Sequence, residues 1–261
     1  MKWATKAKAI VWLHVVRLWR YKLSFLSIAV SSVLWLFLFI LGVLLFVPPE
    51  GQREASLQAF WVVFAWSFVS SGTWLMGAWV RFLISVGLVE EHMLRGVTPY
   101  EVMYGRVIPF LFDVFLTTAI AVLVIGTTFS VNVFEVKDTW ILLLGVVLVF
   151  LQSLSYGLVI TSLSMRTGVP GQLLDVVNML TIGLLMLPAE RIPASVRPLF
   201  YLIPYTAPMQ LIRCGLSGSR DYLALAEGLA VLAVLLTAAA SAARSTLRYL
   251  RREGVKAVGF M

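Results

Sequence analysis

Long apolar segments separated by short charged ones fill most of this 261-residue chain. A bilayer core of ~30 Å takes about 20 apolar residues of α-helix, and we interpret six of the segments as membrane-spanning helices. They cover residues 24–47, 57–83, 103–129, 139–164, 172–187 and 222–243. Hydrophobic residues make up 60% of the chain and charged residues 13%, which is too few polar side chains to cover a water-soluble domain. The sequence therefore predicts an all-α integral membrane protein.

A basic segment, residues 1–23, precedes the first apolar run. At 100° per residue, Lys2, Lys6, Arg17 and Arg20 fall within about 60° of one another on a helix. This pattern predicts an amphipathic helix that lies in the plane of the headgroups, anchored by Trp and basic side chains. The alternative is a plain basic flank that only sets the orientation of the chain.

The basic residues are divided unequally between the two sides of the predicted bundle. An even number of spans places both termini on one side, and 15 of the 21 Lys and Arg residues lie on that side. Basic residues concentrate in the cytoplasm, so both termini are expected there, in a multi-pass protein of the plasma membrane. The net charge of +8 then reflects orientation, and no nucleic-acid partner is expected.

The region 188–221 is apolar but contains five prolines, which is too many for one spanning helix. Irregular backbone at membrane depth must be buried in protein or line a cavity. We therefore expect two short re-entrant helices on the outer face, with Pro188, Pro193, Pro204 and Arg213 in this outer hairpin.

The segment 88–96 follows the second span and carries both charged and apolar residues. The acidic pair Glu90 and Glu91 favours the N-terminal end of a short helix, and Gly96 favours its end. The pattern predicts a short cytoplasmic helix with Met93 and Leu94 as apolar contact residues. A solvated turn between two spans is the alternative.

Motifs for catalysis and cofactor binding are absent from the sequence. It has no phosphate-binding loop of the G-x-x-x-x-G-K-[ST] type, and its two histidines, His14 and His92, lie outside the predicted spans. The single cysteine, Cys214, excludes an intrachain disulfide. No His/Cys/Asp cluster has metal-ligand spacing. We expect neither an enzyme nor a bound cofactor in this chain.

A few ionisable or polar residues lie within the predicted spans, where charge is costly and a functional role is the default hypothesis. They are Asp113 in the third span, Asp175 and Asn178 in the fifth, and Glu227 in the sixth. Each is also open to a structural interpretation, as a partner of a neighbouring helix or of the headgroups.

The order of these features resembles the membrane-spanning permease subunit of ABC-2-type (type V) ABC transporters over nearly the full length of the chain. The segment from Glu90 to Pro99 is similar to the family's E-x-x-x-x-R/K-G-T coupling segment, with Val97 inserted before the threonine. The proline-rich stretches 187–193 and 202–205, followed by Leu211-Ile212-Arg213, resemble its outer hairpin. The run 182–187 lacks the Ser-Gly and aromatic that the family often has there.

The resemblance implies an ATP-driven exporter of lipids, glycans, drugs or peptides. Two permease subunits, identical or different, would enclose a pathway, and a separate subunit would bind ATP and Mg²⁺. The 88–96 helix would dock in a groove of that ATPase through Glu90, Glu91, Met93, Leu94, Arg95 and Gly96. The second and fifth spans are the expected pathway wall, with Trp66, Trp74, Asp113, Asp175 and Asn178 as pathway or packing residues.

Three other functions stay open at this point. A self-sufficient secondary transporter or channel would need charges at mid-membrane depth and usually an inverted repeat, and neither is clear here. A membrane-embedded enzyme acting on lipids would have Asp113, Asp175 and Asn178 as its candidate residues. A membrane scaffold would need no site at all.

Overall fold

The computed structural model describes residues 3–130, 132–167 and 171–254, which form helices and no strand. The N-terminal half consists of α1 (Trp3–Arg20), α2 (Lys22–Leu44), η1 (Pro49–Gly51), α3 (Gln52–Ser71), η2 (Gly72–Ala78), α4 (Val80–Ser85), α5 (Leu88–Leu94), α6 (Pro99–Gly105) and α7 (Val107–Phe129). The C-terminal half consists of α8 (Thr139–Thr167), α9 (Gly171–Met186), η3 (Ala189–Arg191), α10 (Arg197–Tyr201), α11 (Thr206–Ser217) and α12 (Tyr222–Glu253). The all-α prediction is confirmed for these residues.

Five helical segments within the described ranges are long and apolar enough to cross a membrane. They are Lys22–Gly42, Pro49–Ser85, Pro99–Phe129, Thr139–Thr167 and Tyr222–Glu253. Such a set is typical of a multi-pass membrane protein. The remaining predicted span, 172–187, corresponds to α9, which is apolar but only 16 residues long. At 1.5 Å per residue α9 extends about 24 Å, less than the ~30 Å of a bilayer core.

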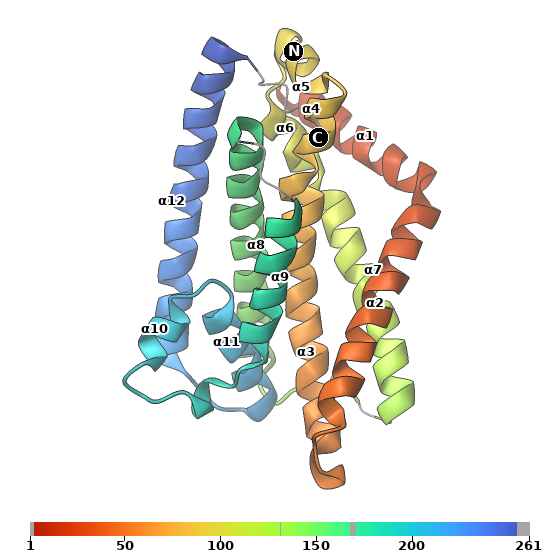
Figure 1. Ribbon diagram of the computed structural model, residues 1–261, viewed down its shortest axis with the longest axis vertical. Coiled ribbons are helices and arrows are strands. Elements are labelled where there is room, and N and C mark those ends of the chain that lie inside the picture. Colours follow the sequence, from red (N-terminus) through yellow and green to blue (C-terminus); the bar gives the residue numbers. More distant parts are fainter. Residues whose placement is uncertain (1–2, 131, 168–170, 255–261) are drawn as a thin grey trace.

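Short helices gather at both ends of the bundle (Figure 1). α1, α4, α5 and α6 lie at one end, together with the C-terminal end of α12. α10 and α11 lie towards the opposite end. The long helices α3, α7, α8 and α12 run between these two ends, so the predicted coupling segment and the predicted hairpin are separated by the length of the bundle.

The helix α8 contacts α11, α12 and η2, and glycines permit its close approach to η2 and to α11. A β-carbon added at Gly157 would lie 2.6 Å from the Gly72 carbonyl oxygen in η2. A β-carbon added at Gly145 would lie 2.9 Å from Ile212 in α11. Neither distance is a real carbon contact, so small residues at these positions set the spacing between the helices.

The proline-rich region folds as η3, α10 and α11, and Pro188, Pro193 and Pro204 stand in the breaks between the helices. α11 is almost completely buried against α8 and α12. The buried guanidinium of Arg213 donates to the carbonyls of Leu185 and Leu187, where α9 ends. Because the last carbonyls of a helix have no partner within it, Arg213 completes the C-terminus of α9.

The helix α1 turns part of its polar side chains towards the rest of the molecule. Its inward face includes the buried His14 and the half-buried Lys6 and Arg17. Trp12, Val15, Val16 and Trp19 form an exposed apolar stripe on the other side. The basic stripe predicted from the sequence therefore includes two residues that face protein.

Candidate functional site

Two glycines in the left-handed conformation flank the short helix α5. Gly87 (φ 68°) precedes it and Gly96 (φ 71°) follows it. At the C-terminal end, the Gly96 N–H donates to the Met93 carbonyl (3.0 Å) and the Val97 N–H donates to the His92 carbonyl (2.8 Å). These two bonds form a Schellman motif, which ends a helix and needs a residue that tolerates positive φ. Gly96 meets that need without a steric penalty.

The next helix, α6, starts at once with a capping box. The Glu101 N–H donates to Thr98 Oγ1 (3.3 Å), and the Thr98 N–H donates to Glu101 Oε2 (2.6 Å). Pro99 occupies the first turn of α6, where its missing N–H costs nothing. A helix stop and a helix start therefore meet within a few residues, and hydrogen bonds fix the backbone on both sides of the bend. We call residues 95–98 the α5–α6 elbow.

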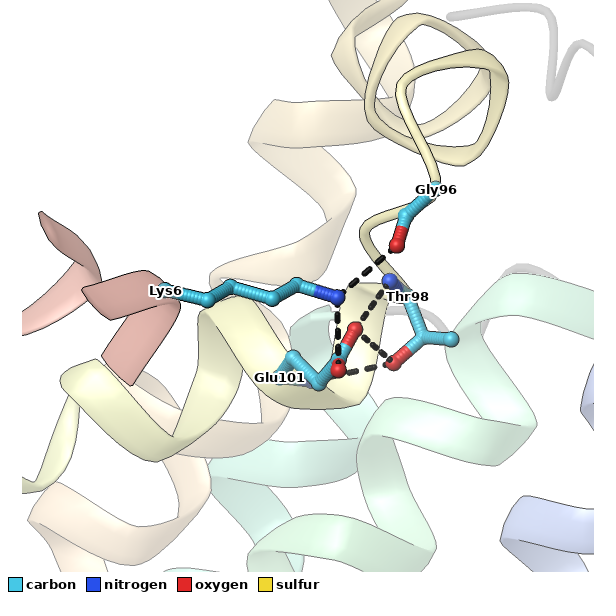
Figure 2. Close-up of polar contacts among 4 residues, drawn as sticks. All are labelled: Lys6, Gly96, Thr98 and Glu101. Carbon is cyan, nitrogen blue, oxygen red and sulfur yellow. Dashed lines mark hydrogen bonds and ion pairs between the residues drawn. The ribbon is translucent and has the colours of Figure 1, made fainter. Parts of the chain in front are cut away.

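Lys6 of α1 bonds to both sides of this elbow (Figure 2). Its ammonium group donates to Glu101 Oε1 (2.7 Å) and to the Gly96 carbonyl (2.8 Å). The two side chains are only 20% and 28% exposed, so water screens this ion pair less than one on an open surface. Lys6 thus joins α1 to the α5–α6 elbow and to α6, through residues that lie 90 and 95 positions further along the chain.

The side chains of α5 divide into an inward and an outward face. Val89 is 1% exposed, and Met93 packs beside it in a cluster of apolar side chains from α4, α6, α8 and α12. Leu94 on the outer side is 89% exposed. Of the two residues expected to be apolar contacts for a partner, Met93 is partly buried against the chain's own core and Leu94 is exposed.

Charged residues surround Leu94 on the outward face. Glu90, Glu91 and Arg95 are all exposed, and Arg95 donates to Glu91 four residues earlier. An exposed pair of this kind adds little to stability. The face therefore combines an acidic pair, a cation and one apolar side chain, and the chain's own fold uses none of them for its core.

His14 is completely buried where α1 lies on α6 and α7. Its Nε2 lies 3.1 Å from the Val102 carbonyl, and its ring meets the edge of Trp79. The Arg106 guanidinium stacks on the same Trp79 at 4.3 Å and donates to the Leu75 carbonyl. Burial, together with the neighbouring Arg106 charge, lowers the pKa of His14 to about 4. The ring is therefore neutral at pH 7 and donates from Nε2 to the carbonyl.

Asp113 is bonded to Ser71 and makes no ion pair with Arg106. The Ser71 hydroxyl donates to Asp113 Oδ2 (2.7 Å), and both residues are buried between α3 and α7. Although Arg106 shares a face of the same span, its guanidinium is engaged with η2. Asp113 thus has a structural partner, at the last residue of α3.

Four other residues named from the sequence line one cavity between α2, α3, η2 and α9. They are Trp66, Trp74, Asp175 and Asn178, and the cavity has a volume of about 540 Å³. Asp113 and Glu227 are not among its lining residues. The structure therefore brings together the tryptophans of the second span and the polar residues of the fifth.

No family model and no curated protein matches the sequence of this chain. Within the described ranges, no three His, Cys, Asp or Glu side chains are placed to hold a metal ion. The function must therefore be inferred from the residues and the geometry.

Two parts of the site were not expected from the sequence. The Lys6–Glu101 pair joins residues 95 positions apart, and His14 lay in a segment interpreted only as a membrane-surface helix. One local signal was present: Thr98-Pro99-Tyr100-Glu101 fits the capping-box pattern, with proline at the first helical position. It indicates the start of α6, but not the partner of Glu101.

Proposed function

We propose that this chain is the membrane-spanning permease subunit of an ATP-driven ABC exporter of the ABC-2 type. A separate subunit binds ATP and Mg²⁺ and hydrolyses the nucleotide. The observation that supports this best is the outward face of α5, which is free of contacts to the core and is held on a hydrogen-bonded elbow. The order of sequence motifs, which resembles that family, agrees with it.

The elbow makes α5 suitable as a lever. An ATPase that gripped Glu90, Glu91, Leu94 and Arg95 would pull on a helix whose inner face packs against α4 and α6. Through Lys6, the same pull would reach α1. ATP binding changes the affinity of the two ATPase subunits for each other, and this difference in binding free energy is what shifts the permease between its states.

In this proposal the chain crosses the plasma membrane six times, with the short helix α9 as the fifth pass. α5, both termini and most Lys and Arg residues lie in the cytoplasm, as the distribution of basic residues favours. α10 and α11 then lie towards the outer face, since they are at the far end of the bundle from α5 (Figure 1).

A second permease subunit completes the pathway. The cavity between α2 and α9 is open on one side and is flanked by exposed apolar side chains on both helices, among them Leu34 and Leu180. A second copy or a related chain that faced this side would enclose the cavity, and lipid would cover the remaining apolar surface.

Purification of the tagged chain from its native membranes tests the proposal. We expect an ATPase subunit with a phosphate-binding loop to copurify, and its identity is established by mass spectrometry. Glu91→Lys reverses a charge on the outward face of α5, and Leu94→Asp places a carboxylate there. Each variant is expected to reduce the recovered ATPase at least tenfold.

The matched control is Glu54→Lys, an equal charge reversal on the exposed start of α3, at the other end of the bundle. It is expected to leave the recovered ATPase unchanged. If the chain performs transport without an ATPase, or if both α5 variants retain the ATPase in full, the proposal is wrong.

A further inference from the structure

The cavity between α2, α3, η2 and α9 has aromatic walls. Trp35 of α2, Trp66 of α3 and Trp74 of η2 all line it. A volume of about 540 Å³ is within the range of small-molecule sites in proteins. Three indole rings around one space offer flat apolar surfaces, and tryptophan is the side chain whose face attracts cations most strongly.

The inner wall of the cavity is fixed by hydrogen bonds between α3, η2 and α9. The Trp66 indole N–H donates to the backbone carbonyl of Asn178 (3.3 Å), and the Thr73 hydroxyl donates to its Oδ1 (3.1 Å). Asn178 and Thr73 are both buried. Because these polar groups already have partners within the chain, Trp66 is held in place before any ligand binds.

Close packing behind the cavity fixes the second tryptophan. Gly72 and Gly157 bring η2 directly against α8, as the short distance to an added β-carbon indicates. Trp74 packs against Ile160 of α8 and Leu174 of α9, and it lines the cavity beside α9.

Among the residues that the structure describes, Asp175 is the only ionisable one that lines this cavity. It is exposed, and in the described part of the chain it accepts no hydrogen bond and forms no ion pair. The Arg81 guanidinium lies near the start of α9, 3.6 Å from a β-carbon added at Gly171. Arg81 is not among the residues that line the cavity, and Asp175 is.

We propose that this cavity binds an amphiphilic organic cation. The positive group lies at the Asp175 carboxylate, and the apolar body lies against Trp35, Trp66 and Trp74. A carboxylate and indole faces both favour a cation over an anion or a neutral molecule of the same shape. Asp175 lies four residues after the start of α9, or about 6 Å along the helix, so the cation binds near one end of the membrane core. That the bound cation is the transported cargo rests on the proposed function; its binding does not.

Binding to the purified chain in dodecyl maltoside tests this inference without any ATPase. The two probes are tetraphenylphosphonium and tetraphenylborate, which share their shape and carry opposite charges. We expect tetraphenylphosphonium to bind at least tenfold more tightly in equilibrium dialysis. Equal affinity for the two ions, or tighter binding of the borate, would overturn the inference.

Variants locate the binding site. Asp175→Asn keeps the shape of the side chain and removes its charge, so the affinity for tetraphenylphosphonium is expected to fall at least tenfold. Glu227→Gln, the same change on α12 outside the cavity, is expected to have no effect. An unchanged affinity in Asp175→Asn would refute the assignment, even if an ATPase copurifies with the chain.

A lipid headgroup is the other source of an organic cation in a membrane. Repeating the dialysis with added phosphatidylcholine separates the two sources. If a free cation is the ligand, its affinity stays the same. If the choline headgroup competes for Asp175, the affinity falls and the cavity belongs to the lipid, contrary to the proposal.

Discussion

Lys6 and Glu101 are 95 positions apart in the sequence, and their charged groups lie 2.7 Å apart. The carboxylate is shared: one oxygen receives the ammonium of α1, and the other caps the start of α6. One acidic side chain therefore holds both the bend after α5 and the position of α1. Loss of either partner should therefore weaken both the bend after α5 and the attachment of α1.

Lys6→Met keeps the length of the side chain and removes the charge. We expect it to destabilise the folded chain by about 1–2 kcal/mol, because a half-buried charged hydrogen bond is lost and a carboxylate is left without its cation. In detergent, this corresponds to a fall of several degrees in the midpoint of thermal unfolding.

Glu101→Gln provides the partner variant, since glutamine still completes a capping box. The double variant is expected to cost less than the sum of the two single variants, because they remove the same interaction. Strictly additive losses would mean that the ion pair contributes nothing.

The stability of the chain should depend on pH through His14. Its pKa is about 4 in the folded chain and 6.5 when exposed, so the unfolded or undocked state binds the proton more readily. Stability from this group is fully present above pH 6.5 and is lost as the pH falls towards 4. At 1.36 kcal/mol per pH unit, the loss is about 2 kcal/mol at pH 5.

Thermal unfolding of the wild type and of His14→Gln at pH 7.5 and pH 5 measures this effect. The wild type is expected to lose more stability on acidification than the variant, which has no group that titrates at position 14. Identical pH dependence of the two proteins would show that His14 takes no part.

Gly157→Ala should separate η2 from α8. The added β-carbon would lie 2.6 Å from the Gly72 carbonyl oxygen, which is backbone and cannot rotate away. The expected cost is about 1–3 kcal/mol of stability. The matched control is Gly183→Ala in α9, where an added β-carbon meets nothing within 4 Å. This control should stabilise the helix by about 0.5–1 kcal/mol. A neutral Gly157→Ala would mean that the two helices are not in close contact.

Gly96→Ala tests the elbow separately from the docking face. The variant leaves Glu90, Glu91 and Leu94 in place but puts a side chain at φ 71°, at a cost of about 1–2 kcal/mol. If α5 is a lever, the ATPase subunit still copurifies and ATP-driven transport falls. Transport at the wild-type rate would show that the elbow need not be stiff, and Gly42→Ala, at an open position of α2, serves as the control.

The hydrophobicity of the sequence predicted where the long helices lie in the chain, but not where they begin and end. The last span was expected at residues 222–243, and α12 continues beyond it to Glu253 through four arginines. A run of apolar residues marks how much of a helix lies in lipid, and carries no information on how far the helix extends into the headgroups or beyond. The third span likewise begins earlier than expected, at Pro99, because its start is set by a capping box instead of by the first apolar residue.

A short helix was expected at residues 88–96, and α5 is observed at Leu88–Leu94, since Gly96 is a strong local signal for a helix end. The residue pairs that build the site could not be predicted from the sequence. Thr73 and Asn178 are 105 positions apart, and each has many possible partners in a bundle. Local patterns give the faces of helices, but the choice of partner depends on how those helices pack.

The residues of η2 wind more widely than those of α3 and α4, as a π-helix of seven residues. In an α-helix each residue turns the chain by about 100°, and in a wider helix each residue turns it by less. The direction in which α4 and α5 leave the membrane is therefore set by the winding of Gly72–Ala78. Rewinding this stretch to α geometry would rotate α5 about the axis of α3 while Trp66 stayed still, so the winding of these seven residues connects the aromatic cavity with the orientation of α5.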